Sequence, residues 1–328
     1  MLSKQKQLYQ SYIIGLKEQI KESLTITGDF KILEDINHIV IVGKGVNSIA
    51  SDMLKTYLNL PNLTTASGFE LPNFPKNSKN VLFFILSYSG EDDEALFHYR
   101  AALKNGCKII GVTGGGQLKQ AFERNMKERI LIPQKVPEWA ALPYLFFPVL
   151  KVLENSGIVP SQKTNVDDLL LDLSGQYQTT AQQFSVNLKS KVILVYASSY
   201  MLPAAKRWKS QLNNISRVPS FFGNISDVVN DELNGFSTIL PNVHVVLLRC
   251  IYDNENVQRQ IDAAKTVLRS LKVSTTEIVV KKHNALTTLF SAVHLGDWIA
   301  FNLGQELLDS ETMGEDAVEM FRKFYKKQ

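Results

Sequence analysis

Three loops hold the residues of this chain that are best suited to bind a ligand. They are residues 43–48 (Gly-Lys-Gly-Val-Asn-Ser), 87–90 (Ser-Tyr-Ser-Gly) and 113–116 (Thr-Gly-Gly-Gly), and each directly follows an apolar run. Small side chains let backbone N–H groups approach a ligand, and the N-terminus of a following helix favours negative charge. The types and spacing of these residues therefore predict an anion-binding site.

The segments around these loops alternate between short apolar runs and amphipathic stretches. The predicted strands are residues 38–42, 81–86, 108–112 and 130–132, and the predicted helices are residues 48–60, 91–105 and 139–154. Such alternation is typical of a parallel, doubly wound sheet. In these sheets ligands bind beyond the carboxyl ends of the strands, so we expect the three loops at one common edge.

We expect the same organisation a second time after a polar segment at residues 157–165. Predicted strands are residues 192–196, 244–248 and 277–280, and predicted helices are residues 166–188, a segment near Arg207, 258–271 and 285–308. Apolar residues recur every four positions from Leu8 to Leu24, which predicts one N-terminal helix packed across both halves. The expected fold class is α/β, with two flavodoxin-like or Rossmann-like doubly wound parallel sheets. The expected division is an N-terminal helix in residues 1–29 and domains at residues 30–155 and 165–328.

Composition argues against several classes of protein. The 328 residues are 45% hydrophobic with a formal net charge of +4, and no apolar run reaches the roughly 18 residues that a membrane span needs. Without a basic face or a recognisable motif, no nucleic-acid partner is expected. Two cysteines and five histidines without ligand spacing predict neither a disulfide scaffold nor a metal site. We expect a cytoplasmic protein with no membrane segment.

Five short motifs occur along the chain in a definite order. Residues 87–90 (Ser-Tyr-Ser-Gly) and 113–115 (Thr-Gly-Gly) follow consecutive predicted strands. Residues 140–143 (Ala-Ala-Leu-Pro), 207–213 (Arg-Trp-Lys-Ser-Gln-Leu-Asn) and 295–298 (Leu-Gly-Asp-Trp) come later in the chain. In this order the segments resemble the sugar isomerase (SIS) domain, and more specifically the bifunctional phosphoglucose/phosphomannose isomerases built from two such domains. The resemblance covers nearly the whole chain.

The resemblance implies a sugar-phosphate ligand and a cofactor-free aldose–ketose isomerase. The residues that it places at the substrate or its phosphate are Gly45, Asn47, Ser48, Ser87, Ser89, Asp92, Thr113 and Gly114. Two of them depart from the family pattern, because Asn47 replaces a Ser and Asp92 replaces a Thr. Glu91 and Asp92 add negative charge where a phosphate would bind, although carboxylates in the first turn of a helix are also favoured by its dipole.

The catalytic positions that the resemblance implies depart further from the family. Asn214 stands where the family has its Glu base, and Asn230 stands where it has the His that opens the sugar ring. Trp139 replaces an Arg that stabilises charge in the intermediate. A basic residue near the C-terminus is retained as Lys323 or its neighbour Arg322.

Asp231 and Glu232 are the candidates for a replacement base, since they directly follow Asn230; the alternative is that they belong to a solvated turn before Gly235. Two classes of function stay open. The chain is either a hexose-phosphate isomerase or a catalytically degenerate protein that senses a sugar derivative. The family borrows its His across a dimer interface, so the resemblance also implies a homodimer. Because the base and the His are replaced, we expect weak binding and little turnover.

Overall fold

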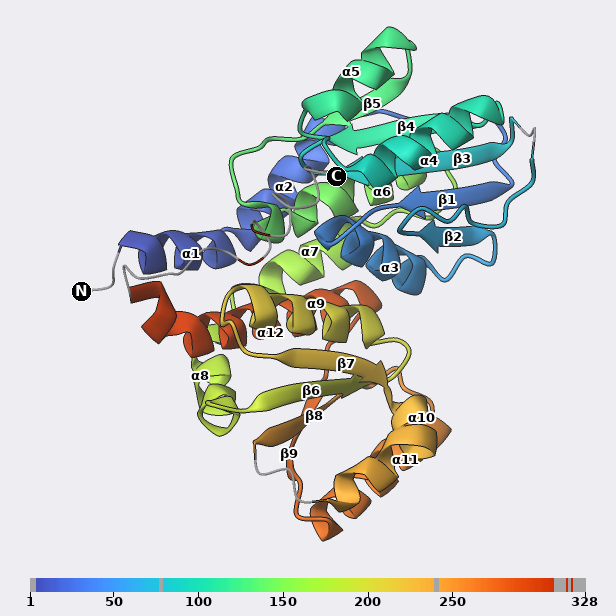
Figure 1. Ribbon diagram of the computed structural model, residues 1–328. Coiled ribbons are helices and arrows are strands. Elements are labelled where there is room, and N and C mark those ends of the chain that lie inside the picture. The colour runs from blue at the N-terminus through green and yellow to red at the C-terminus, as the bar shows by residue number, and fades with distance from the viewer. Residues whose placement is uncertain (1–3, 77–78, 239–241, 310–316, 318–319, 321–328) are drawn as a thin grey trace.

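The computed structural model describes residues 4–76, 79–238, 242–309, 317 and 320 of the chain, and in these it forms two parallel sheets (Figure 1). The first sheet has the order β2-β1-β3-β4-β5 and the second the order β7-β6-β8-β9, with every pairing parallel. The strands are β1 (His38–Val42), β2 (Leu63–Ala66), β3 (Val81–Ser87), β4 (Lys108–Thr113), β5 (Glu128–Leu131), β6 (Val192–Ala197), β7 (Ser220–Asn224), β8 (Val243–Cys250) and β9 (Ser274–Val280). The predicted α/β class with parallel sheets is confirmed.

Helices cover both faces of the first sheet. Val40 and Val42 point into an apolar cluster with α4 (Asp93–Lys104) and α5 (Gly116–Arg124). Ile39 and Ile41 belong to a second cluster with α3 (Val46–Leu58) and α6 (Leu142–Asn155). Alternate residues of a strand face opposite sides of a sheet, so an unbroken apolar run such as residues 39–42 can fill both clusters.

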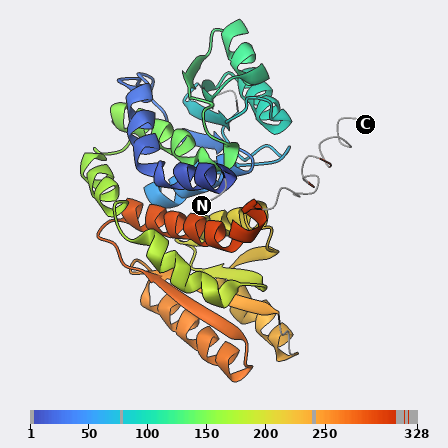
Figure 2. The ribbon, with the colours of Figure 1, turned by 90° about the vertical axis from the view of Figure 1, so that its left-hand side faces the viewer.

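The second sheet is covered in the same way. On one face, Val245 and Leu247 pack against α11 (Glu255–Ser270) and an irregular helical segment at residues 225–237. That segment consists of α10 (Ile225–Asp227), a π-helical turn (Val228–Glu232) and a 3-10 helix (Leu233–Ser237). On the other face lie α9 (Leu202–Asn214) and α12 (Ala285–Asp309), and α7 (Lys163–Asp172) and α8 (Tyr177–Leu188) pack on α12. Figures 1 and 2 show α12 crossing the middle of the molecule.

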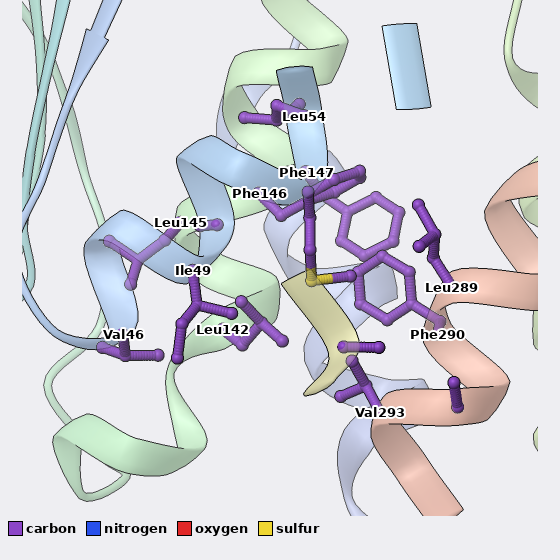
Figure 3. Close-up of a cluster of buried hydrophobic side chains, with 14 of the residues drawn as sticks. Val46, Ile49, Leu54, Leu142, Leu145, Phe146, Phe147, Leu289, Phe290 and Val293 are labelled. Carbon is purple, nitrogen blue, oxygen red and sulfur yellow. The ribbon is translucent and has the colours of Figure 1, made fainter. Parts of the chain in front are cut away.

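The two halves share one apolar core. The ring of Phe290, from α12, lies 5.0 Å from that of Phe146 and 5.1 Å from that of Phe147, both from α6. Figure 3 shows these rings meeting side chains from α3 and α12, among them Ile49 and Val293. The apolar cluster therefore continues from one half into the other and fixes how the two sheets are placed.

Two predicted helices are each interrupted by a glycine. The N-terminal segment is two helices, α1 (Lys4–Ile14) and α2 (Leu16–Thr27), which meet at Gly15. The prediction of a single helix there was wrong, because glycine lacks the side chain that stabilises a helix interior. As expected, the segment packs on both halves, α1 on α12 and α2 on α6. The helix predicted at residues 166–188 is likewise split into α7 and α8 near Gly175.

The predicted strands are present with small shifts at their ends, but sequence patterns missed β2, β7 and α5. Both missed strands lie at the edge of a sheet and are four and five residues long. Edge strands are half-solvated, so they lack the continuous apolar run that marks β1 or β3. In the parts of the chain that the structure describes, no helix has the length and apolar character required to cross a bilayer.

Candidate functional site

The three loops predicted to bind a ligand lie side by side at the carboxyl edge of the first sheet. The backbone N–H of Tyr88 donates to Oδ1 of Asn47 over 3.1 Å, which ties the second loop to the first. The backbone N–H of Gly114 donates to the carbonyl oxygen of Tyr88 over 3.1 Å, which ties the third loop to the second. Asn47 is fully buried, so its amide serves to hold two loops together.

Gly90 allows the second and third loops to approach each other closely. Its φ of +76° lies in the left-handed region, and a Cβ there would come within 1.8 Å of the carbonyl oxygen of Gly115. The carbonyl oxygen of Gly90 accepts a hydrogen bond of 2.9 Å from the backbone N–H of Leu118, in the first turn of α5. A side chain at position 90 would therefore disrupt this edge.

The hydroxyl groups of the site are engaged in bonds within the loops. Ser87 is fully buried; its Oγ donates to Oδ2 of Asp92 over 2.5 Å and accepts from the backbone N–H of Gly90 over 3.0 Å. Thr113 is also fully buried, and its Oγ1 lies 3.3 Å from the backbone nitrogen of Gly115. Ser89 is half-buried and its Oγ accepts from the backbone N–H of Glu91 over 3.2 Å. Of these hydroxyl groups, that of Ser89 is the most accessible to a ligand.

The carboxylate of Glu91 is bound at the N-terminus of α5. Oε1 of Glu91 accepts from the backbone N–H of Gln117 over 3.2 Å, and Oε2 accepts from the Gln117 side chain over 2.9 Å. Helix N-termini favour anions, so Glu91 is stabilised there. Glu91 thus accepts from the helix N-terminus, and Asp92 accepts from the Ser87 hydroxyl. Both donors are of the kind that would bind a ligand anion.

Lys206, which sequence analysis missed, reaches this edge from the second half. Its Nζ, on α9, lies 2.6 Å from Oδ2 of Asp52 and donates to Oγ of Ser48 over 3.0 Å, both on α3. Ser48 in turn donates to the carbonyl oxygen of Gly45 over 2.9 Å. A cation therefore stands at the first turn of α3. Nothing in the local sequence around residue 206 separates this lysine from one exposed on a helix surface.

The catalytic positions implied in the second half are on the surface. Asn214 is exposed at the end of α9, where its Nδ2 donates to Oγ of Ser210 over 3.3 Å. Asn230 and Asp231 are exposed, as predicted for solvated residues before Gly235, and the backbone that carries them is a π-helical turn. Glu232, in the same turn, accepts a hydrogen bond from the Tyr196 hydroxyl, and burial together with this carboxylate raises the pKa of Tyr196.

Trp139 belongs to the joint between the two halves. Its ring stacks on that of Tyr9 with 5.2 Å between centroids, and its carbonyl oxygen accepts from Nη1 of Arg207 over 2.6 Å. Arg207 is 2% exposed and binds both carboxylate oxygens of Asp297, at 3.0 and 2.9 Å. The adjoining cavity, lined in part by Trp139 and Arg207, is about 10 Å³ in volume, far too small for a sugar. Trp139 and Arg207 therefore act here as structural residues.

The remaining expectations concern the C-terminus and metals. Arg322 and Lys323 lie outside the residues that the structure describes. Among the residues that it does describe, no group of three His, Cys, Asp or Glu side chains is arranged to hold a metal ion. Cys107 and Cys250 are both buried free thiols. Of the predicted site residues, the structure brings together those of the first-sheet edge, and Lys206 joins them there.

Known proteins are similar to this chain in sequence and in fold. Residues 177–312 match the family model described as the bacterial phospho-glucose isomerase C-terminal SIS domain. The chain is 26% identical to the bifunctional phosphoglucose/phosphomannose isomerase of Caldicellulosiruptor bescii over 89% of this chain and 91% of that protein. It is also 26% identical to the D-glucosamine-6-phosphate 4-epimerase of Sulfolobus acidocaldarius, over 68% of this chain and 72% of that protein.

A solved structure with a similar fold is the C-terminal domain of glucosamine-fructose-6-phosphate aminotransferase from Francisella tularensis. The TM-score is 0.65 with 14% sequence identity, over 90% of this chain and 96% of that one. This similarity concerns the fold, while the sequence matches concern the family. Residues 177–312 therefore match a SIS domain, and the chain resembles the bifunctional phosphoglucose/phosphomannose isomerases over most of its length.

Proposed function

We propose that this protein binds a sugar phosphate at the carboxyl edge of the first sheet and belongs functionally with the phosphosugar isomerases. The observation that carries the proposal is the set of hydrogen bonds that joins the three loops into one edge, from Asn47 to Tyr88 and from Tyr88 to Gly114. Ligands of open parallel sheets bind at such an edge. The names of the relatives, which are phosphosugar isomerases and a phosphosugar epimerase, support the same ligand class.

The proposed chemistry is aldose–ketose isomerisation with little turnover. Moving a proton between C1 and C2 of a sugar needs a positioned base. The amides of Asn214 and Asn230 cannot accept that proton, and both side chains are exposed. Asp231 and Glu232 stay the proposed replacement bases. No cofactor takes part in this proposal.

A sugar-derivative sensor is the second candidate function. It is favoured by the exposed amides at positions 214 and 230, because a binding protein needs no base at either position. Fold alone does not choose between a sensor and an isomerase, since function depends on the site.

Calorimetric titration tests the proposed ligand class. The purified protein would be titrated with glucose 6-phosphate, fructose 6-phosphate and mannose 6-phosphate, with unphosphorylated glucose as the matched control. We expect saturable, weak binding of at least one hexose phosphate and none of glucose at the same concentrations. Equal binding of glucose and its phosphate would contradict a phosphate site at this edge, and so would no binding of any phosphate.

We propose a cytoplasmic homodimer whose two SIS domains span residues 30–155 and 165–328, with residues 1–29 packed across them. Support for a dimer comes from exposed apolar residues of the second half. Phe221 is 59% exposed and Phe222 37% exposed on the edge strand β7. A groove of about 690 Å³ between the π-helical turn and α11 is lined partly by Val229, Leu233 and Val267. Light scattering at micromolar concentration should give twice the chain mass of 36.9 kDa, and a 36.9 kDa species alone would contradict the dimer.

A further inference from the structure

A lysine from the second half of the molecule reaches the first of the three loops. Nζ of Lys206, on α9, donates to Oγ of Ser48 over 3.0 Å, and Oγ of Ser48 donates to the carbonyl oxygen of Gly45 over 2.9 Å. Ser48 and Gly45 both belong to residues 43–48, which follow β1 at the carboxyl edge of the first sheet. The positive charge of Lys206 is therefore held at the edge where the sugar phosphate is proposed to bind.

Lys206 keeps both a donor and access to solvent. An ammonium group has three donors, and the bonds of Lys206 to Ser48 and to Oδ2 of Asp52, at 2.6 Å, use two of them. The Lys206 side chain is 30% exposed, whereas Ser87 and Thr113 at the same edge are fully buried. A phosphate oxygen can therefore accept a hydrogen bond from Lys206 while the two existing bonds stay in place.

Asp52 offsets the charge of Lys206 only in part at the ligand. Asp52 lies four residues after Ser48 on α3, which is about one helical turn. Because α3 leads away from the loop, Asp52 is further than Ser48 from a ligand at the loop. The ammonium bonds to both side chains and so lies between them along the helix. Coulomb energy falls with distance, so a ligand anion is attracted by Lys206 more than it is repelled by Asp52.

Further charged side chains at this edge are engaged within the chain. Lys44 pairs with Glu94 over 2.9 Å, and Glu91 and Asp92 each accept a hydrogen bond. These bonds offset part of each charge, but carboxylates do not attract a phosphate. A lysine that is already ordered by two bonds can supply that attraction, and it has none to offer to uncharged glucose.

We propose that Lys206 binds the phosphate group of the ligand and makes the site prefer phosphorylated sugars to uncharged ones. The phosphate site then consists of loops from the first sheet and a cation from α9 of the second half. This inference rests on the proposed sugar-phosphate site and names the residue that determines its specificity.

The test separates binding by Lys206 from a structural role of its ion pair. Lys206→Met removes the ammonium, whereas Asp52→Asn breaks the same ion pair and leaves the ammonium in place. Lys209→Met is the matched control, because Lys209 lies about one turn further along α9 and is not the amine that donates to Ser48. Dissociation constants of glucose 6-phosphate, fructose 6-phosphate and mannose 6-phosphate would be measured by calorimetry at pH 8, where the phosphate is a dianion.

We expect Lys206→Met to weaken each hexose phosphate that wild type binds by about 10–100-fold, since a hydrogen bond between charged groups is lost. Asp52→Asn should tighten binding about threefold or more, because a competing carboxylate is removed. Lys209→Met should change each constant less than about threefold, since salt screens a more distant charge. Equal losses in Lys206→Met and Asp52→Asn would overturn the inference, because the ion pair would then act only by holding the structure.

Lys206→Arg guards against a folding defect. It restores the positive charge, so it should bind more tightly than Lys206→Met, with thermal denaturation showing that both variants fold. An arginine variant as weak as the methionine one would overturn the inference. If wild type binds a hexose phosphate and Lys206→Met binds it equally well, the inference fails while the proposed function stands. If wild type binds none of the three, both fail.

Discussion

At the carboxyl edge of the first sheet, Asn47, Ser87 and Thr113 are fully buried and bond to the loops, whereas in the second half Asn214 and Asn230 are exposed. The first group owes its position to hydrogen bonds between neighbouring loops. Asn214 bonds within its own helix, to Ser210. The proposed binding edge is thus held in place by bonds between loops, whereas the positions that the resemblance implies for catalysis are exposed on the surface.

This difference shows which part of a site the fold itself preserves. The backbone of a parallel sheet places strand-end loops together whatever side chains they carry, and burial then selects residues that bond there. The fold does not select a proton-transferring side chain in this way, because that side chain is needed for the reaction and not for the packing of the loops. Side chains at the positions that the resemblance implies for the base and the ring-opening residue can therefore differ without a change of fold.

Breaking the buried ion pair between Arg207 and Asp297, on α9 and α12 of the second half, should have the largest effect on stability. Arg207→Met keeps the side-chain bulk but leaves Asp297, 6% exposed, without its guanidinium partner. Removing one partner of a buried ion pair lowers the free energy of unfolding by about 3–5 kcal/mol. Urea denaturation at pH 7 measures this loss.

Lys206→Met is the matched control on the same helix. The Lys206 side chain is 30% exposed, and its ion pair with Asp52 is partly solvated. Its loss should lower the free energy of unfolding by less than about 1 kcal/mol. Equal losses for Arg207→Met and Lys206→Met would show that the buried pair contributes no more to stability than the partly solvated one.

Disrupting the binding edge directly should have the next largest effect. Gly90→Ala forces a Cβ against the Gly115 carbonyl at a φ of +76°, which combines strain with overpacking. We expect the free energy of unfolding to fall by about 2–4 kcal/mol and sugar-phosphate binding to be lost. Gly157→Ala has a similar φ of +69° but open space around the Cβ, so about 1–2 kcal/mol is expected there. If the two alanine variants were equally stable, the close approach at Gly90 would carry no weight.

A smaller effect is the dependence of stability on pH that arises from His294, on α12 of the second half. Burial lowers the pKa of His294 from its usual 6.5 to about 4. The unfolded chain therefore takes up this proton below pH 6.5 while the folded chain does not, and stability falls as the pH falls from 6.5 towards 4. Between pH 7 and pH 5 the loss from this residue is about 2 kcal/mol.

His294→Gln isolates that contribution. Its free energy of unfolding should fall by about 2 kcal/mol less than that of wild type between pH 7 and pH 5 in urea denaturation, because glutamine does not titrate in this range. Parallel losses in the two proteins would mean that the imidazole, which accepts a hydrogen bond from Trp298 Nε1 over 3.2 Å, titrates normally in the fold.

Much of the fold could be predicted because buried parallel strands leave a strong local signal. The runs at residues 39–42 and 81–86 are apolar throughout, since both faces of each strand are covered. The short edge strands β2 and β7 lack this signal, and Gly15 and Gly175 interrupt helices whose apolar spacing continues past them. Local pattern does not show where a helix is interrupted, because tertiary packing decides whether a glycine is tolerated.

The loops of the candidate site could be predicted from the sequence, but the hydrogen bonds between its side chains could not. Loop residues such as Ser87 and Gly90 are recognisable by type and by their place after a strand. That Ser87 donates to Asp92, and that Lys206 crosses from α9 to Ser48, depends on side-chain directions and on contacts between residues 158 positions apart in the second case. Such contacts follow from how the two halves pack, for which the sequence holds no local pattern.

The turnover of fructose 6-phosphate is the most direct test of the proposal that the binding edge is kept while catalysis is lost. The purified protein would be assayed at saturating substrate with a coupled isomerase assay, alongside Asp231→Asn and Glu232→Gln. We predict a rate at least 10²–10⁴-fold below typical enzymes, whose turnover is about 1–10³ per second, because the positioned base is missing. Turnover within that typical range in wild type would contradict the account, and its loss in either variant would identify the residue that has replaced the base.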